Sequence, residues 1–217
     1  MFGFLRRREC LVPTFRGWLV LGVVFALAGF ALVRGIYPWL AVQDSIPGGV
    51  LVAEGWAPDR ALALTIEEFQ RHPYRGIYVT GIPMEKGAVL SEYGTFAELS
   101  AATLIRLGAD PRTVQAVPTA EVRKDRTYAS AVALRDWLRA HQIPADQVNV
   151  VSVGAHSRRT RLLFAKAFGP ATRVGIIAIP HADFDTAQWW RSSQGFRIVT
   201  SEVIAYVYAR LLFRAES

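Results

Sequence analysis

The chain has 217 residues, of which 52% are hydrophobic and 20% charged, a balance that suits a packed core and excludes an intrinsically disordered protein. The formal net charge is +7, but residues 1–16 supply +3 of it through four arginines and one glutamate. The rest of the chain carries no dense basic stripe, which argues against a nucleic-acid-binding protein. The single cysteine, Cys10, permits neither an intramolecular disulfide nor a zinc site built from cysteine pairs.

The first predicted element is a membrane-spanning helix. Residues 17–33 contain no charge, and the apolar stretch continues beyond Arg34, whose charge can extend to the membrane interface. Four arginines precede this run, whereas only Arg34 follows it before Arg60. The positive-inside rule therefore predicts a cytoplasmic basic tail over 1–16, a transmembrane helix over 17–40 and a domain outside the cytoplasm.

The apolar segment has two other interpretations. A cleaved signal peptide would need a small-x-small site after the apolar run, and no clean one follows it. A buried core helix would seldom be apolar on every face over this length. The sequence therefore favours a single-pass protein of the inner (cytoplasmic) membrane.

Beyond Pro47-Gly48-Gly49, short apolar runs alternate with helical patterns. The predicted strands are 50–53, 77–80, 114–117, 148–153 and 174–179, and the predicted helices are 60–71, 92–107, 127–141, 157–168 and 202–213. Asp59 is the predicted N-cap of the first of these helices. Strands that are apolar on both faces and separated by helices form a parallel sheet covered on both sides. We therefore predict a Rossmann-like, doubly wound α/β domain over residues 48–213.

Two basic clusters follow strands of this predicted sheet, at the edge where open parallel sheets bind ligands. One comprises Arg158, Arg159 and Arg161, and the other Arg123, Lys124 and Arg126. Each opens a helix, where cations are unfavourable unless an anion or acidic side chains compensate them. Bidentate arginines suit phosphate, so the sequence predicts a phosphate or diphosphate site where the clusters meet.

Glu54, directly after a buried strand, and His156 are the candidate acid and base. Glu54 is equally consistent with a metal ligand or with an ion pair to one of the arginines. His156 is equally consistent with a capping or packing role. Asp125 and Thr127 suit a helix start as well as a binding site. One helix turn cannot direct all three arginines of the later cluster inward, so at least one of them is expected in solvent.

Several familiar signatures are absent, among them G-x-S-x-G, the P-loop, G-x-G-x-x-G and H-E-x-x-H. Standard dinucleotide, nucleoside-triphosphate and zinc-protease chemistry is therefore not expected. The sequence leaves any cofactor unknown and supplies no predicted metal ligand set.

The ordered set of motifs resembles the YdcF/SanA/ElyC-like family over about residues 48–213. The matching segments are Val50-Leu-Val-Ala-Glu-Gly55, Ser91-Glu92-Tyr93, Asp125-Arg-Thr127-Tyr-Ala-Ser-Ala131 and Ser152-Val-Gly-Ala-His156-Ser-Arg-Arg159. The resemblance implies a Rossmann-like fold, an N-terminal anchor helix and a role in cell-envelope integrity that touches peptidoglycan or lipid-carrier metabolism. It adds Gly55, Glu92 and Ser152 to the residues expected to contact a substrate.

The leading hypothesis is an envelope-homeostasis protein that binds, and hydrolyses or transfers, a phosphorylated envelope intermediate. Its expected partners are the bilayer and a phosphorylated small molecule or lipid-carrier intermediate, with no nucleic acid. One alternative is a non-catalytic scaffold that docks onto envelope-synthesis proteins through Trp189-Trp190. The other is a cytosolic enzyme with a nucleotide-like ligand, which requires the opposite topology.

Overall fold

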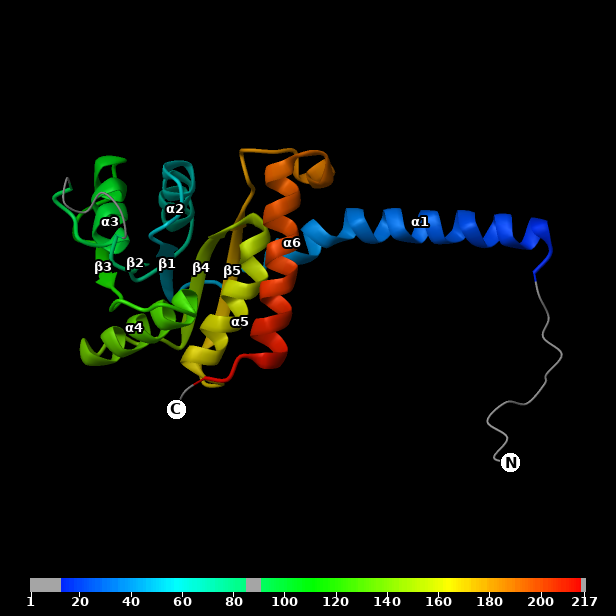
Figure 1. Ribbon diagram of the computed structural model, residues 1–217. Helices are drawn as coiled ribbons and strands as arrows, with labels where there is room; N and C mark the ends of the chain where they lie inside the picture. The colour runs from blue at the N-terminus through cyan, green and yellow to red at the C-terminus, as the bar shows by residue number, and fades with distance from the viewer. Residues whose placement is uncertain (1–12, 85–90, 216–217) are drawn as a thin grey trace, which may run out of the picture.

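A five-stranded, all-parallel sheet forms the centre of the computed structural model, which describes residues 13–84 and 91–215 (Figure 1). The strands are β1 (Val50–Glu54), β2 (Ile77–Gly81), β3 (Val114–Pro118), β4 (Gln147–Val153) and β5 (Arg173–Ile179). Their order is β3-β2-β1-β4-β5, so the sheet grows outward from β1 in both directions. Each predicted strand is confirmed to within one residue at either end, because buried parallel strands are nearly continuous apolar runs.

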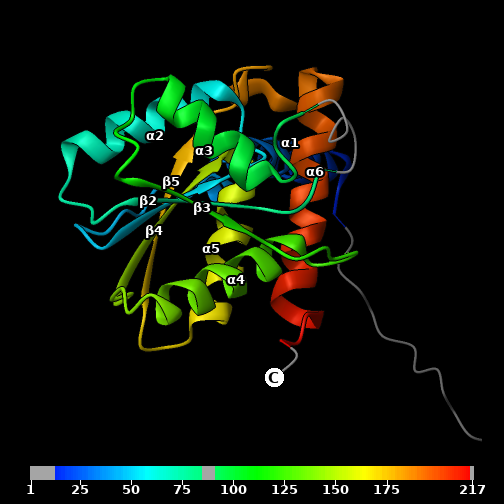
Figure 2. The ribbon, with the colours of Figure 1, turned by 90° about the vertical axis from the view of Figure 1, so that its left-hand side faces the viewer.

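Helices cover both faces of this sheet (Figure 2). On one face α2 (Asp59–Arg71) and α3 (Phe96–Arg106) pack against one set of strand side chains. On the other, α4 (Arg126–Ala140) and α5 (Ser157–Phe168) pack against the alternate set. The doubly wound α/β architecture predicted from the sequence is therefore confirmed.

Two helix starts on the first face were predicted wrongly. The helix expected from residue 92 begins at Phe96, because Thr95 and Glu98 form a capping box. The Thr95 hydroxyl accepts a hydrogen bond from the Glu98 amide at 3.2 Å, and the Glu98 carboxylate accepts one from the Thr95 amide at 2.9 Å. Asp59, expected as a cap, is the first helical residue of α2, and Pro58 occupies the cap position without a side-chain hydrogen bond.

The chain after β5 also differs from prediction. It forms a short helix, η3 (Thr186–Arg191), then α6 (Ser193–Val207) and a π-helical turn, η4 (Tyr208–Leu212). The helix expected from residue 202 thus begins at Ser193, because the Ser192 hydroxyl accepts a hydrogen bond from the Gly195 amide at 3.3 Å.

A long helix, α1 (Phe15–Leu40), projects from the domain (Figure 1). It has 26 residues, and its most apolar 18-residue window has a mean hydropathy of 2.3 and no buried residue. At the usual rise per residue it extends about 39 Å, more than the ~30 Å hydrocarbon core of a bilayer. By length and composition α1 can cross a membrane. The part of the predicted basic tail that contains Arg6, Arg7, Arg8 and Cys10 lies outside the described residues.

The last turns of α1 are packed into the domain. Tyr37 is buried in a third apolar cluster together with Trp189. The Trp189 indole N–H donates to the Val33 carbonyl at 3.0 Å, and the Arg158 guanidinium lies 4.5 Å from the centre of the Trp39 ring. These contacts fix α1 to η3 and α5. Because Trp189 is 4% exposed, it is not available for the protein-contact surface considered from the sequence.

Candidate functional site

A cavity of about 500 Å³ lies at the carboxyl ends of β1 and β2, next to the point where the strand order reverses between β1 and β4. Ligands bind at such switch points in open α/β sheets. Eight of the residues predicted for the site line this cavity: Glu54, Arg123, Lys124, Asp125, Arg126, Thr127, His156 and Arg159. The structure therefore brings the candidate acid, the candidate base and the earlier basic cluster together.

Glu54 is a buried residue of the cavity wall, with 4% of its surface exposed. The Ser152 hydroxyl donates to its Oε2 at 2.5 Å, and the Thr160 hydroxyl donates to its Oε1 at 3.3 Å. His156 Nε2 lies 3.5 Å from Oε1. Burial opposes ionisation of Glu54, but the His156 charge and hydrogen bonding from His156, Ser152 and Trp56 outweigh it and hold the pKa of Glu54 below its usual value.

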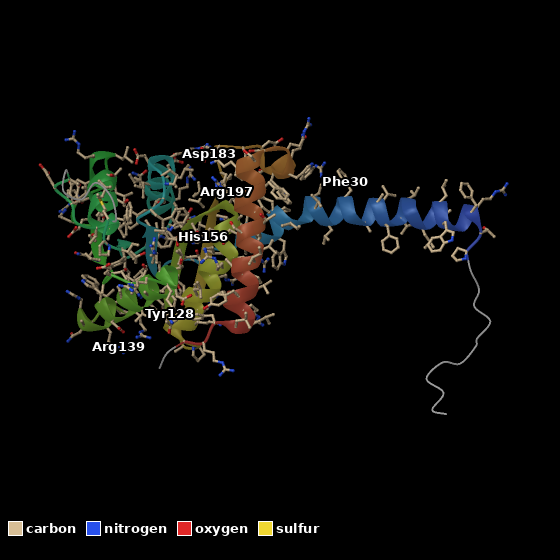
Figure 3. The ribbon with its side chains drawn as sticks, in the orientation of Figure 1. Phe30, Tyr128, Arg139, His156, Asp183 and Arg197 are labelled. Carbon is tan, nitrogen blue, oxygen red and sulfur yellow. The ribbon has the colours of Figure 1, made fainter. Side chains whose placement is uncertain are left out.

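His156 ends the short helix η2 (Gly154–His156) and is held from its other side by Glu202 of α6. Its Nδ1 lies 3.0 Å from Glu202 Oε1, and Arg159 donates to both Glu202 oxygens at 2.9 and 3.0 Å. Figure 3 shows His156 in the interior of the domain, beside α5 and α6. A histidine, an arginine and two carboxylates thus form one cluster under the cavity.

The opposite charges in this cluster stabilise one another, whereas the Arg159 charge disfavours protonation of His156. Burial on its own would lower the pKa of His156, but Glu54 and Glu202 outweigh it and raise that pKa to about 9. Burial likewise opposes ionisation of Glu202, but His156 and Arg159 lower its pKa to about 2. At neutral pH two anions therefore balance two cations, which reduces the energetic penalty of burying them.

One ring nitrogen of His156, Nε2, lies beside Glu54 at the cavity wall. It is buried, makes no hydrogen bond of normal length among the described residues, and has Glu54 Oε1 at 3.5 Å as its ion-pair partner. Because the ring is protonated at neutral pH, Nε2 carries a hydrogen that a ligand oxygen in the cavity can accept. The arrangement suits His156 to the role of an acid, and leaves the ionised Glu54 as the base.

The segment 123–127 forms the basic part of the cavity wall. It leads into α4, whose cap residue, Asp125, has a φ of 54° and makes no side-chain hydrogen bond to the helix. The Asp125 side chain therefore does not cap the amides of the first turn, which lie next to the cationic side chains of Arg123 and Arg126. Helix amides and cations together favour an anionic ligand.

The later basic cluster does not converge on the cavity as a whole. Arg158 stacks on Trp39, and Arg161 forms an ion pair with Asp44 at 2.5 Å. Neither lines the cavity, because successive helical residues point about 100° apart and only Arg159 is directed toward Glu202. The prediction that Arg158 and Arg161 contact a substrate therefore finds no support in the geometry.

The residues added by the family resemblance are placed differently from one another. Ser152 is fully buried and orients Glu54, so it acts behind the cavity wall. Glu92 is exposed, precedes α3 and does not line the cavity. A Cβ at Gly55 would lie 2.7 Å from the carbonyl oxygens of Phe96 and Thr80, so Gly55 permits close packing of β1 against its neighbours.

Gly55→Ala is expected to lower the free energy of unfolding by about 2 kcal/mol or more, because backbone atoms cannot yield easily to the added methyl group. Urea unfolding of the full chain in detergent, followed by tryptophan fluorescence, measures this change. Gly94→Ala is the matched control, since the nearest atom there is a side-chain oxygen 3.6 Å away. The control should change stability by less than about 0.5 kcal/mol. Equal effects of both variants would contradict the packing role.

Sequence reasoning missed several residues of the site. Glu202 was interpreted only as part of a helix start, although it is the single carboxylate between residues 193 and 214. A lone acid in an otherwise apolar and basic segment was the signal that could have identified it. Trp56, whose ring meets that of His156 edge-on at 5.0 Å, and Thr160 gave no distinct signal.

The site carries no metal-binding geometry in the described part of the chain. Among residues 13–84 and 91–215, no group of three or more histidine, cysteine, aspartate or glutamate side chains is arranged to hold a metal ion. No protein-family model, curated protein or solved structure matches the chain. The family resemblance therefore remains a prediction from the sequence motifs.

Proposed function

We propose that the chain is a single-pass inner-membrane protein whose α/β domain, outside the cytoplasm, binds a phosphorylated cell-envelope intermediate and hydrolyses or transfers its phosphoryl group. The observation that carries this proposal is the composition of one cavity wall. The uncapped amides of α4, the cationic side chains of residues 123–126 and the buried Nε2 of His156 all border the same space.

A phosphate group suits this wall in shape and charge. The α4 dipole and the amides of its first turn, which the Asp125 side chain does not cap, attract a negative charge. Arg123 can form two parallel hydrogen bonds with phosphate oxygens. A cavity of about 500 Å³ admits a diphosphate together with part of the group that carries it.

The opposite pKa shifts of Glu54 and His156 suit hydrolysis. In the proposed step, water attacks phosphorus and gives its proton to the Glu54 carboxylate. The bond to the leaving oxygen breaks, and that oxygen takes the proton of His156 Nε2. The 3.5 Å between Glu54 and His156 then allows the proton to return from the acid to the ring, which restores both groups.

Inorganic diphosphate is expected to bind the full chain in detergent, and Arg123→Ala is expected to weaken that binding by at least about tenfold, or ~1.4 kcal/mol. Isothermal titration calorimetry measures the affinity. Arg139→Ala is the control, since Arg139 is an exposed arginine at the far end of α4 (Figure 3). No binding by the wild-type chain, or equal affinity in all three proteins, would defeat the proposal.

Turnover and topology need separate assays. Release of inorganic phosphate from farnesyl diphosphate, lost in His156→Gln, is the expected sign of hydrolysis. Binding of diphosphate without release of phosphate would mean that the protein recognises the ligand but does not hydrolyse it.

Alkaline phosphatase fused after Ser217 should be active, since that enzyme folds only outside the cytoplasm. An inactive fusion would favour the opposite topology.

A further inference from the structure

The segment formed by α6 and η4 lies across the direction of α1, on the side of the domain from which α1 projects (Figures 1 and 2). Its exposed side chains are mainly apolar. We call these the α6 apolar face: Phe196, Ile204, Val207, Tyr208, Leu211 and Leu212. Ile204, Leu211 and Leu212 are 70%, 73% and 69% exposed, values unusual for large aliphatic side chains gathered on one helix.

The charges of this segment are divided between its two sides. Glu202, its single carboxylate, is turned inward to His156 and Arg159. Arginines 197, 210 and 214 are exposed beside the apolar face. An apolar face flanked by arginines, with the acid on the opposite side, is typical of helices that lie in the interface of an anionic membrane.

Contacts with α1 locate this segment near the proposed membrane. The Trp190 ring meets that of Phe30 edge-on at 6.1 Å, and Trp189 bonds to the Val33 carbonyl. Both tryptophans belong to η3, which is followed directly by α6. The start of α6 is therefore held beside the part of α1 whose side chains are apolar and exposed.

We infer that the α6 apolar face rests on the bilayer surface, with its apolar side chains at the boundary between headgroups and acyl chains and its arginines at anionic headgroups. This inference rests on the proposed passage of α1 through the membrane. A bilayer fits the face better than a second copy of the chain does. The docked α1 brings the face to the membrane, and exposed arginines at a self-association surface would repel one another.

Site-directed spin labelling of the full chain tests the contact. In a Cys10→Ser background, Val207→Cys and Leu211→Cys are labelled with a nitroxide and reconstituted into phosphatidylcholine vesicles that contain phosphatidylglycerol. Collision rates with oxygen, which concentrates in lipid, and with a water-soluble nickel chelate report the environment of each label. We expect an oxygen-to-nickel ratio several-fold higher at both positions than at Arg139→Cys, an exposed site on α4.

Leu27→Cys, at an exposed position of α1, distinguishes the bilayer contact of the α6 apolar face from the membrane anchor itself. A lipid-like ratio at Leu27→Cys with a water-like ratio at Val207→Cys and Leu211→Cys would overturn the bilayer contact and leave the anchor intact. Water-like ratios at all positions would overturn the anchor as well. Spin–spin broadening at Leu211→Cys that disappears on dilution with unlabelled protein would identify a second copy as the occupant, which also overturns the inference.

Discussion

Glu54→Gln is expected to destabilise the domain by about 3–5 kcal/mol at pH 6 and to lower the pKa of His156. The carboxylate is buried, and its charge is the largest of the influences that keep His156 protonated. An amide of the same shape preserves the packing but leaves the His156–Arg159–Glu202 group with an uncompensated positive charge. The loss should shrink toward pH 9, since His156 can then become neutral and no longer needs a counter-charge.

Urea unfolding of the full chain in detergent at pH 6 and pH 9 measures the stability change, and histidine NMR titration measures the pKa. Glu67→Gln is the control, because Glu67 forms an exposed ion pair with Arg71 at 2.8 Å on α2. Such surface pairs contribute at most about 1 kcal/mol. A Glu54→Gln protein as stable as the control would show that the buried carboxylate is not needed as a counter-charge.

A double-mutant cycle assigns the effect to the pair. Glu54→Gln combined with His156→Gln should lose clearly less stability than the sum of the single losses, because each single variant strands a charge that the double variant removes. Strict additivity would mean that the two side chains, 3.5 Å apart, do not interact energetically.

The sheet could be predicted from the sequence because its signal is local. Central strands such as β1 and β4 are buried along almost their whole length and are therefore apolar in sequence. The start of α3 was equally local but was misplaced, because the apolar spacing that includes Tyr93 was given more weight than the Thr95-x-x-Glu98 capping box. Helix boundaries depend on such single hydrogen bonds, which periodicity does not report.

The site could be predicted only in part, because it depends on tertiary contacts. The edge where Glu54, His156 and residues 123–127 meet follows from the topology of a parallel sheet. The different partners of the three arginines of α5 do not follow from the topology. They depend on where Asp44, Trp39 and Glu202 lie in space. Glu202 lies 46 residues from its histidine partner, a separation that no motif of this chain spans.

The stability of the wild-type chain is expected to fall as the pH rises from 7 toward 9. His156 has a pKa of about 9 when folded, against 6.5 for an ordinary histidine. Below pH 6.5 it is protonated in both states and its stabilisation is complete, and the stabilisation is lost as the pH rises through 9. The slope should approach ~1.4 kcal/mol per pH unit in this window, for a total of roughly 3 kcal/mol. The stabilisation from Glu202, whose pKa is lowered to about 2, is complete above pH 4.5 and is lost as the pH falls from there toward 2.

His156→Gln should remove most of this slope, whatever its effect on absolute stability. Urea midpoints of wild-type and variant chains, measured in detergent between pH 7 and pH 9, give the comparison. His181 does not interfere, because burial lowers its pKa and it is neutral in both states above pH 7. His141→Gln, at an exposed helix end, should retain the wild-type slope. A wild-type chain with flat stability over this range would mean that His156 is not held as a buried cation, and the acid assigned to the proposed hydrolysis would then be missing.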